Sequence, residues 1–511
     1  MEQSTLSAGD KIATGMDPLI QARISKIDSL RNLGIDPYPA RFNRTATTTE
    51  ARARIERLEA RSRKQQGQLR TRALTVAGRI MGLRSMGKAA FADIQDGEGR
   101  IQLHLRADRL GADYSLVDLL DLGDFVGARG PVFRTRRGEI SIEAKELTVL
   151  AKAVRPMPDK WSGLQDTEKR YRQRYLDLIS SERSMEIAKK RAAIIRSMRD
   201  FLHQRGFVEV ETPVLVSVAA GGMASPFVTH HKALDRTLYL RIATELHLKR
   251  MVIGGMEKVF EIGRLFRNEG IDRTHNPDYT SLESYEAYVD YKDVMAMVEQ
   301  MIFNIAMDVN GAPVVSYIDG DGPEIDLTPP WPRLDLCEQV KRYSGIDFLD
   351  TRDRVSLARA MEHRGIHVDE RASWGRLLDK VISSTVEPQL EQPSFLVDYP
   401  VEMSPLAKRK SESDGIVERF EAFVGGSEIA NAFTELNDPV DQRSRFEEQE
   451  RLRQEFGEEE LDRLDEDFLV AVEHGMPPTG GLGMGIDRLA MLLTGERSIR
   501  EVILFPQLRT L

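Results

Sequence analysis

Residues 265–285, LFRNEGIDRTHNPDYTSLESY, place many charged and hydrogen-bonding side chains between two segments of alternating polar and apolar residues. The alternation predicts two β-strands joined by a loop. A tight turn needs little more than glycine and asparagine, whereas this connection carries Arg267, Glu269, Arg273 and His275. Arg267 ends the first predicted strand, which should hold its guanidinium in a fixed position. We therefore interpret the loop as one wall of a ligand site.

A second group of candidate residues follows near the C-terminus, in GGLGMGIDR, which places Arg488 at the start of a predicted helix behind four glycines. Glycines let a ligand approach the backbone closely, and a guanidinium suits phosphate oxygens. Glu421 and Glu428 lie between the two arginines along the chain, in neighbouring strand-like segments separated by two glycines. Paired carboxylates near a phosphate-binding arginine are typical of Mg²⁺ bound to a nucleotide. The chain has neither a Walker loop nor a dinucleotide glycine fingerprint, so neither common nucleotide fold is indicated.

Each of these signals also has a simpler interpretation. A glycine-rich turn before a helix is often only a turn, and carboxylates on strands are often exposed to solvent. The order of the signals along one chain is far more specific than any one of them. We therefore expect the two arginines and the two glutamates to meet in one nucleotide site.

The elements that must position these residues begin with an N-terminal region of short strands. Residues 18–33 predict an amphipathic helix and residues 51–66 a basic one. From residue 73 onward, five alternating segments are separated by turn residues: ALTVAGRIM, AAFADIQD, RIQLHLR, DFVGARGPVFRT and GEISIEAKELTVLAK. They favour a small closed β-barrel, for which the OB fold is the common five-stranded form. OB barrels often bind single-stranded nucleic acid by aromatic stacking, and Phe91 is either a stacking residue or part of the core.

The pattern beyond the barrel predicts a region of mixed helices and strands. Residues 156–180 contain prolines and then many charges, which indicates a linker. Residues 182–205 predict an amphipathic helix, and the strand FVEVETP follows it. Residues 291–309 predict another helix, while residues 312–393 are less regular and indicate an insertion. We thus divide the chain into a helical extension (1–72), the barrel (73–155), the linker (156–180) and a C-terminal domain (181–511).

The composition indicates a globular protein of two or three domains, with 511 residues of which 41% are hydrophobic and 30% charged. The chain has no apolar run long enough to cross a membrane, no signal-peptide pattern and one cysteine, Cys337, so we expect a cytoplasmic protein without an internal disulfide. The net charge is −9, but residues 41–110 hold 16 Lys and Arg against 7 Asp and Glu. A basic module that binds nucleic acid would explain this asymmetry, and so would an ordinary charged surface.

Three of these stretches resemble the signature motifs of class II aminoacyl-tRNA synthetases: GFVEVETP motif 1, FRNEG…HNPDYTSLESY motif 2 and GLGMGIDR motif 3. The barrel is similar to that of the subgroup that charges lysine, aspartate or asparagine. RYRQRYLDLI, THHKALD, TELHLKRMVIGG, VEMSPLAKRK and EIANAFTELNDP resemble the lysyl-tRNA synthetase family in particular, and the resemblance runs from about residue 17 to the C-terminus. It implies an α+β fold in which a five-stranded OB-fold β-barrel precedes a class II catalytic domain, an antiparallel sheet flanked by helices.

The resemblance also implies roles for individual residues. The implied lysine contacts are Gly221, Glu245, Glu283, Tyr285, Asn431, Phe433 and Glu435, and the implied Mg²⁺ ligands are Glu421 and Glu428. ATP would be bound by Arg267, Glu269, His275, Asn276, Tyr279, Gly485 and Arg488, of which Arg267 and Arg488 are the catalytic residues; the anticodon would be read by Arg84, Phe91, Gln102 and Glu139. A desolvated ammonium must be paired with carboxylates, which independently favours lysine as the substrate of a pocket with three glutamates. Ser225 stands where the family usually has arginine.

The implied activity is the ATP-dependent attachment of lysine to tRNA(Lys) through a lysyl-adenylate, with several Mg²⁺ ions. Motif 1, which includes Pro213, implies a homodimer. Two alternatives remain: a paralogue that lysylates a protein, and a tRNA-binding protein without catalytic activity. The first would characteristically lack the barrel, and the second would have lost the motif residues, yet this chain keeps both.

Overall fold

A computed structural model describes residues 17–61, 69–158, 164–222, 224–411, 413, 415–457 and 464–509. The chain divides into two compact units, residues 1–163 and 164–511. Each unit has its own hydrophobic core. Within the described residues, no helix is long and apolar enough to cross a membrane.

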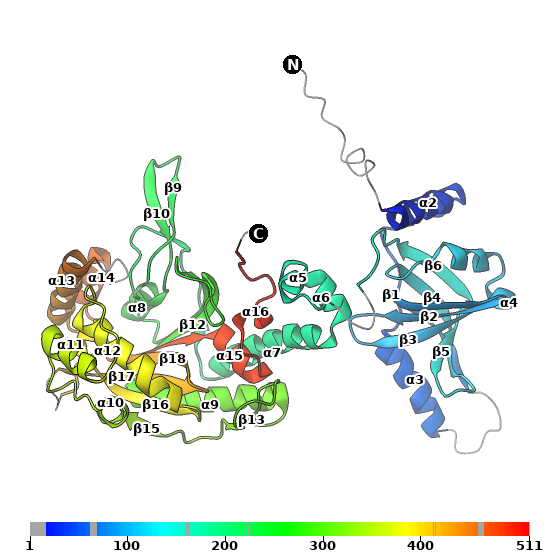
Figure 1. The fold of residues 1–511 in the computed structure, drawn as a ribbon. Helices are drawn as coiled ribbons and strands as arrows, with labels where there is room; N and C mark the ends of the chain where they lie inside the picture. The colour runs from blue at the N-terminus through cyan, green and yellow to red at the C-terminus, as the bar shows by residue number, and fades with distance from the viewer. Residues whose placement is uncertain are drawn as a thin grey trace. The chain divides into compact units, whose positions relative to one another are not determined.

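The N-terminal unit is a closed barrel, as predicted (Figure 1). Its strands are β1 (Arg70–Met86), β2 (Ala89–Gln95), β3 (Arg100–Arg106), β4 (Phe125–Arg134), β5 (Ile140–Glu143) and β6 (Glu146–Ala151). The long strand β1 closes the barrel because one half of it pairs with β2 and the other half with β4. Alternate residues such as Ile80, Ile94 and Leu103 point inward and are fully buried.

One predicted barrel strand forms two strands in the structure. The segment GEISIEAKELTVLAK divides into β5 and β6, and both pair with β4, at opposite ends of it. A single straight strand could not follow β4 along the whole curve of so small a barrel. The helices of this unit are α2 (Pro18–Asn32), α3 (Thr48–Arg61), α4 (Ala107–Leu110) and the 3₁₀ segment η1 (Gly111–Leu119). The predicted basic helix therefore begins three residues early, and its predicted end, 62–66, lies outside the described residues.

The C-terminal unit is built on a large sheet with the strand order β15-β16-β17-β18-β19-β12-β11-β7. Its strands are β7 (Val208–Glu209), β11 (Lys258–Phe266), β12 (Asp278–Ala287), β15 (Arg333–Asp335), β16 (Ser394–Pro400), β17 (Ile416–Val424), β18 (Ser427–Thr434) and β19 (Thr479–Gly485). The interior pairs are antiparallel, as predicted, but β7 and β15 join the two edges in parallel. Small separate sheets contain β8 (Leu215–Val216), β9 (Val228–His231), β10 (Arg236–Leu240), β13 (Val314–Val315) and β14 (Ile325–Asp326).

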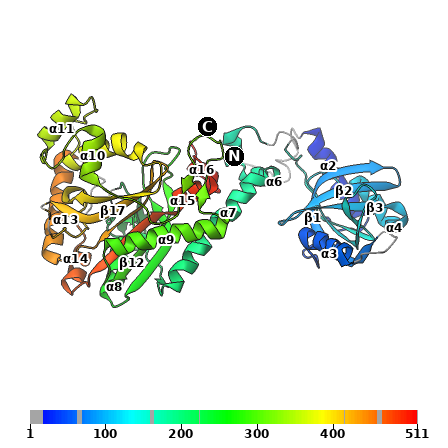
Figure 2. The ribbon, with the colours of Figure 1, turned by 90° about the horizontal axis from the view of Figure 1, so that it is seen from below.

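Helices α7 (Glu182–Gln204), α9 (Tyr291–Asn310) and α15 (Ile486–Thr494) pack against one face of this sheet (Figure 2). Their apolar side chains and those of the sheet form the largest core, with Ile194, Val298, Phe420 and Leu489 fully buried. Alternation along the strands then sends every second side chain to the opposite face, where the pocket lies. The unit also contains α8 (Glu245–Ile253), α13 (Pro439–Phe456), α14 (Glu466–Glu473) and α16 (Ile499–Val502).

The segment that the sequence indicated as a linker is partly helical. Residues 167–180 form α5 (Thr167–Arg172) and α6 (Arg174–Ser180). Arg174 is buried, donates to the carbonyl oxygens of Leu504, Arg500 and Ile503, and pairs with Asp177 at 2.7 Å. The charges of this segment therefore anchor residues 167–180, the larger part of the predicted linker 156–180, within the C-terminal unit.

Residues 312–393 are more regular than the sequence indicated. They contain β13–β15 and the helices α10 (Leu336–Ser344), α11 (Arg354–His363) and α12 (Trp374–Val381), followed by the π-helical turn η2 (Ile382–Val386) and the 3₁₀ turn η3 (Glu387–Gln389). These helices share a core with residues of β16 and β17, such as Leu396 and Val417. The segment therefore completes one edge of the catalytic sheet.

Candidate active site

The pocket floor is formed by rows of residues that face one another across β17, β18, β19 and β12. Strand pairing places Glu421, Asn431, Gly483 and Glu283 in one row. A second row, two residues along, contains Arg419, Phe433, Gly481 and Tyr285. The glycines of β19 leave the middle of both rows without side chains. The result is a cavity of about 470 Å³, a size typical of small-ligand sites.

Gly481 makes room for protein atoms rather than for a ligand. A Cβ at this position would lie 1.8 Å from Glu435 Oε1 and 2.6 Å from Tyr285 Cε1. Gly480 is similar, since its Cβ would meet the Val294 side chain at 2.7 Å. Gly483 is different, because a Cβ there would meet only the Asn431 carbonyl oxygen, at 3.8 Å. The expectation that this glycine run admits a ligand therefore fails for Gly480 and Gly481.

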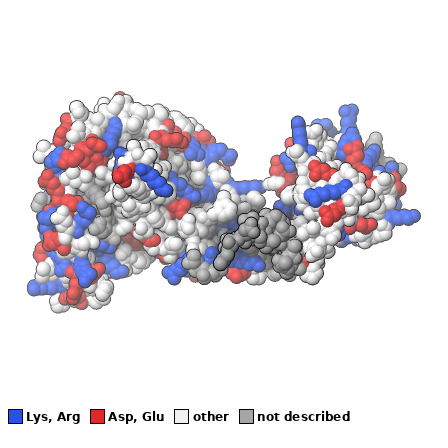
Figure 3. All heavy atoms as spheres, turned by 90° about the horizontal axis from the view of Figure 1, so that it is seen from above, with Lys and Arg blue, Asp and Glu red and all other residues white. Residues whose placement is uncertain are grey.

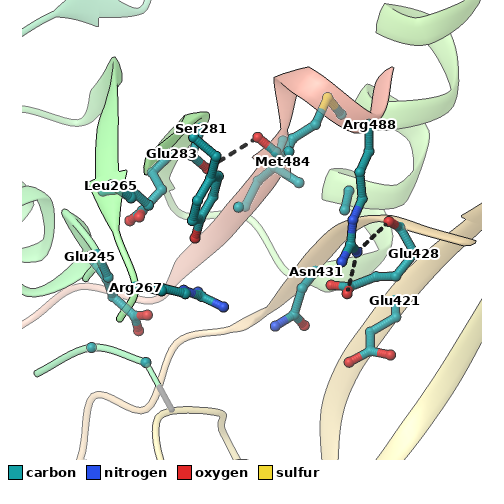
Figure 4. A pocket seen from close by; sticks show the side chains of 18 of the residues that line it. Glu245, Leu265, Arg267, Ser281, Glu283, Glu421, Glu428, Asn431, Met484 and Arg488 are labelled. Atoms are coloured by element: carbon teal, nitrogen blue, oxygen red, sulfur yellow. Dashed lines mark hydrogen bonds and ion pairs between the residues drawn. The ribbon is translucent and has the colours of Figure 1, made fainter. Parts of the chain in front are cut away.

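The seven residues that the family resemblance assigned to lysine all line this cavity: Gly221, Glu245, Glu283, Tyr285, Asn431, Phe433 and Glu435. They come from the loop before β9, from α8, from β12 and β18, and from the residue that follows β18. All three glutamates are buried, with 9% or less of each residue exposed. Figure 4 shows Glu245 and Glu283 on the same side of the pocket.

Burial controls the protonation of these acids. Burial and, to a smaller extent, the Glu245 carboxylate raise the pKa of Glu283 to about 7, although the Thr244 backbone N–H donates to Glu283 Oε1 at 3.0 Å. Burial also raises the pKa of Glu435 well above its usual value, while Lys249 opposes that shift. Several carboxylates in a desolvated pocket without a cationic ligand thus favour bound protons. A ligand ammonium would displace those protons.

Lys249 is a residue that the sequence reasoning missed, although it lies in the quoted segment TELHLKRMVIGG. Its ammonium contacts Glu245 Oε1 at 2.6 Å and also pairs with Glu435, and its side chain is fully buried. The four-residue spacing from Glu245 along α8 is the only local signal for this contact. The pairing with Glu435 depends on the tertiary structure.

Arg267 follows β11 and lies in the cavity with Tyr279, whose ring centroid is 5.4 Å from the Arg267 Cζ atom. The Arg267 Nε atom is buried and has no hydrogen-bond partner among the described residues. A buried guanidinium donor without a partner is suited to an anionic ligand. Figure 4 shows the guanidinium pointing across the cavity.

Arg488 extends from the first turn of α15 into the cavity on the side opposite Glu283 (Figure 4). Its Nη1 donates to the Glu428 backbone oxygen at 2.8 Å and its carboxylate at 3.2 Å, while Nη2 lies 3.1 Å from His275 Nε2. The neighbouring Asp487 fixes the start of this helix, because it accepts from the Thr280 N–H at 2.8 Å and pairs with Arg191 at 2.5 Å. Sequence reasoning had missed Asp487.

The loop residues predicted to contact ATP differ in their surroundings. Glu269 is exposed at the mouth of the cavity, and Gly485 lines it next to Arg488. Asn276 also lines the cavity, but its amide donates to the Asp278 carbonyl oxygen at 2.7 Å, and its carbonyl oxygen accepts from the Gln507 N–H at 3.2 Å. In this structure the bonds of Asn276 hold the loop in place.

Glu421 and Glu428 lie near each other at the Arg488 side of the cavity (Figure 4). Burial and the Glu428 carboxylate together raise the pKa of Glu421 to about 7, against the effect of Arg419. Two acids from residues 312–393 join them: Asp379 of α12 lines the cavity, and burial and the neighbouring carboxylates raise the pKa of Glu387 to about 7. Sequence reasoning had missed both.

This acidic group is suited to a divalent cation that a nucleotide helps to hold. Among the described residues, no three His, Cys, Asp or Glu side chains are arranged to hold a metal ion by themselves. Mg²⁺ usually binds through one or two carboxylates together with phosphates and water. Burial first and the neighbouring Glu428 carboxylate second raise the pKa of Glu421, and a bound cation would oppose both effects. The donor set therefore fits Mg²⁺ brought with a nucleotide.

The predicted anticodon residues lie on the barrel of the other unit. Arg84 and Phe91 face each other across β1 and β2, and Phe91 lies outside the barrel core, stacked on His104 of β3 with ring centroids 4.6 Å apart and planes 3° apart. Gln102 donates to Asp93 at 3.3 Å, and Arg84 lies 3.4 Å from the same carboxylate. One outer face thus presents an aromatic pair beside polar groups.

Glu139 differs from the other three in that it lies outside the barrel strands, just before β5, with Arg52 3.7 Å away. The surplus of basic residues does not form a continuous patch on the face in view, where basic and acidic side chains alternate over both units (Figure 3). Most arginines of the barrel have acidic partners, such as Arg134 with Glu59 at 2.8 Å. Exposed pairs of this kind are weak, so a polyanion can compete for the arginines.

Comparisons with known proteins agree for both units. Residues 166–509 match the family model described as tRNA synthetases class II (D, K and N), and residues 74–150 match the OB-fold nucleic acid binding domain. The chain is 51% identical to a lysine–tRNA ligase of Moorella thermoacetica over 96% of this chain and 98% of that protein. It is 51% identical to one of Dehalococcoides mccartyi over 95% of this chain and 96% of the relative. It is 48% identical to one of Staphylococcus epidermidis over 97% and 99%.

Proposed function

The chain belongs to the class II tRNA synthetases that handle aspartate, lysine and asparagine, and we propose that its cavity joins lysine to ATP as the first step of tRNA lysylation. Its overall activity is the attachment of lysine to tRNA, the activity named for relatives that match it over nearly their whole length. The single observation that supports lysine within this family is the set of three buried glutamates at one side of the cavity. An aspartate substrate would need cationic side chains there instead.

The residues at the two ends of the cavity indicate how the two substrates would lie. The ammonium of lysine would face Glu245, Glu283 and Glu435, and its carboxylate would point towards Arg267. ATP would place its α-phosphate at Arg267, its adenine against Tyr279 and its outer phosphates towards Arg488 and His275. The lysine carboxylate then attacks the α-phosphorus in line, and pyrophosphate leaves. This reaction needs no protein nucleophile, because positioning and charge stabilisation supply the catalysis.

Arg267 and Arg488 carry the chemical part of the proposal. Arg267 would stabilise the charge that grows on the α-phosphate oxygens, since its Nε donor already lies buried without a partner among the described residues. Arg488 would exchange its present contact with Glu428 for phosphate oxygens. The Glu428 carboxylate, together with Glu421, would then be available to Mg²⁺, which supplies charge neutralisation between the phosphates when it is bound.

The second step transfers the lysyl group to the terminal ribose hydroxyl of the tRNA, with release of AMP. The outer barrel face with Arg84, Phe91 and Gln102 would bind the anticodon, where an unpaired base can stack on the free side of the aromatic pair and hydrogen-bond to polar groups. Glu139 is proposed as a further anticodon contact on the strength of the family resemblance alone.

A homodimer is the proposed assembly, and the cytoplasm is the proposed location. The region that follows motif 1 exposes apolar residues, including Val214, Leu215 and Val228 of or beside the small β8–β10–β9 sheet. Exposed apolar residues in one neighbourhood are typical of a protein interface. Gel filtration with light scattering would test the assembly, and Leu215→Glu is expected to shift it towards a monomer.

The experiment that tests the function is ATP–pyrophosphate exchange across all twenty amino acids. Lysine alone should support rapid exchange, and exchange with aspartate or asparagine at the rate of lysine would refute the pocket assignment. Charging of tRNA(Lys) transcripts, compared with labelling of cellular proteins, separates tRNA lysylation from lysylation of a protein. A chain that binds tRNA without catalysing exchange would support a non-catalytic role.

A further inference from the structure

Lys249 places a permanent ammonium against the carboxylates that are proposed to bind lysine. The residue lies one turn after Glu245 on α8, and its Nζ is 2.6 Å from Glu245 Oε1 and in contact with Glu435 Oε2. Its side chain is fully buried, and the Phe433 and Phe468 ring centroids lie 5.4 and 5.8 Å from Nζ. The ammonium is therefore held by two acids and two aromatic rings.

The two acids have a second side that faces the cavity. Glu245 and Glu435 belong to the described residues that line the cavity, whereas Lys249 does not. The Glu435 Oε1 atom is buried and has no hydrogen-bond partner among the described residues. It lies over Gly481, where an added Cβ would be 1.8 Å from it. One oxygen of Glu435 thus faces Lys249, while the other remains for a ligand.

We propose that Lys249 is a positioning residue for substrate recognition: its ammonium holds Glu245 and Glu435 from behind in a fixed orientation, so that they present their cavity side to the ammonium of a substrate lysine. The inference rests on the proposed function, because it assumes that lysine binds in this cavity. It adds a fixed internal cation to the three glutamates. The pocket then carries enough negative charge for one further ammonium, which is the charge that distinguishes lysine from neutral amino acids of similar length.

The charged groups around Glu245 and Glu435 support this role of Lys249. Glu283 and Tyr285 of β12 face Glu245 and Glu435. Arg267 lies in the same cavity and interacts with Glu283. Burial acts to lower the pKa of Lys249, but Glu245 and Glu435 outweigh it and the pKa is raised, so the ammonium stays charged. Burial raises the pKa of Glu435, and Lys249 is the group that counteracts this. Without Lys249, Glu435 would hold its proton to a higher pH and would pair poorly with an ammonium ligand.

A purely structural ion pair makes a different prediction. If Lys249 only stabilised the packing of α8, its loss would lower the melting temperature without a specific effect on lysine binding. If it positions the acids, the Michaelis constant for lysine should rise while that for ATP stays nearly constant. The pH dependence of lysine binding should change as well, because the charge of Lys249 sets the protonation of its partners.

The test compares Lys249→Met, which keeps the approximate shape without the charge, with Lys249→Arg, which keeps the charge. Exchange assays should show a Michaelis constant for lysine about 10- to 100-fold higher for the Met variant, the range typical when groups that support ligand contacts are removed. That defect should shrink as the pH is raised and Glu435 loses its proton. The Arg variant should retain the wild-type pH profile. The ATP constant should change by less than about threefold in both.

Lys152→Met is the matched control. Lys152 is also fully buried and ion-paired, with Asp121 at 2.8 Å and with Asp124, but it lies in the barrel unit. Its loss should lower the melting temperature and leave the Michaelis constant for lysine unchanged. An effect on lysine binding equal to that of Lys249→Met would show that any buried lysine matters, and would overturn the inference.

Two further outcomes keep the inference separate from the proposed function. If Glu435→Gln leaves lysine binding unchanged, the pocket assignment itself fails. If Glu435→Gln weakens lysine binding but Lys249→Met keeps the wild-type constant and pH profile, only the role of Lys249 is refuted. If the Met variant does not fold, a shifted pH profile in Lys249→Arg refutes it, and an unchanged profile supports it.

Discussion

Replacing Gly481 by alanine tests the geometry of the amino-acid side of the pocket most directly. Gly481 lies in β19 between Phe433 on one neighbouring strand and Tyr285 on the other. The added methyl carbon would be 1.8 Å from Glu435 Oε1, whereas ordinary contact begins at 3.4 Å. The carboxylate must therefore move by about 1.6 Å, because the β19 backbone is hydrogen-bonded on both sides. The alanine would also press on the Tyr285 ring, at 2.6 Å.

The expected cost follows from that displacement. Overpacking of a well-packed site costs about 1–3 kcal/mol of stability, which lowers the melting temperature by several degrees. A misplacement of about 1 Å in a recognition group can cost about 100-fold, or about 2.7 kcal/mol. We therefore expect the Michaelis constant for lysine in pyrophosphate exchange to rise about 100-fold. The constant for ATP should change less, because Arg488, which is proposed to contact the outer phosphates, lies across the cavity from Glu283 (Figure 4).

Gly483→Ala is the companion variant, two residues along the same strand. Its methyl carbon would meet only the Asn431 carbonyl oxygen at 3.8 Å, so it should leave the melting temperature unchanged. If exchange is lost in this variant, a ligand must approach the Gly483 backbone closely, because the added methyl carbon disturbs no protein contact. Wild-type lysine binding in a folded Gly481→Ala protein would refute the assignment of Glu435 to substrate recognition.

Three further predictions concern the phosphate contacts, the pH dependence and the anticodon face. Arg267→Ala should lower the rate of exchange by about 100- to 1,000-fold, because it removes a donor aimed at the charge that develops on the α-phosphate. Circular dichroism should show that the variant stays folded. Exchange within tenfold of the wild-type rate would contradict this role of Arg267. Burial raises the pKa of Glu283 to about 7, and the protonated acid must lose its proton before it can pair with an ammonium. The Michaelis constant for lysine should therefore rise by up to about tenfold for each pH unit below 7. Glu283→Gln should weaken lysine binding and flatten this pH dependence, and a pH profile unchanged by the substitution would exclude Glu283 as its source. Phe91→Ala should weaken the binding of tRNA by about 1–3 kcal/mol, and so its charging, because base stacking on the barrel is lost. Pyrophosphate exchange should stay unchanged. Equal loss of charging and exchange would contradict a separate anticodon site.

Much of the fold and of the site follows from local sequence pattern. Period-two alternation predicted the barrel strands and the strands that flank the loop after Arg267, because successive strand residues face opposite sides of a sheet. The same rule explains why Asn431 and Phe433 reach the cavity while Ala432, between them, packs in the core. The predicted lysine and ATP contacts all line one cavity in the structure, while their individual roles stay predictions.

Local pattern was weaker wherever the role of a residue depends on a distant part of the chain. The charged segment 167–180 looked like a linker, because charge alone cannot show that Arg174 is buried against carbonyl oxygens near the C-terminus. Residues 312–393 looked irregular, yet they bring Asp379 to the cavity and Glu387 close to the paired glutamates. Hydrophobic periodicity describes which face of an element is buried, and not what lies opposite that face.

The sequence by itself determined the family resemblance, the element types and the set of acids and arginines available for catalysis. Only the tertiary structure decided that Gly481 leaves space for Glu435, and that Lys249 lies behind the substrate acids. Both depend on the approach of β18, β19 and α8, which are far apart along the chain. The physical reason is that close packing and charge pairing act between surfaces in space, whereas sequence spacing constrains only neighbours on one helix or strand.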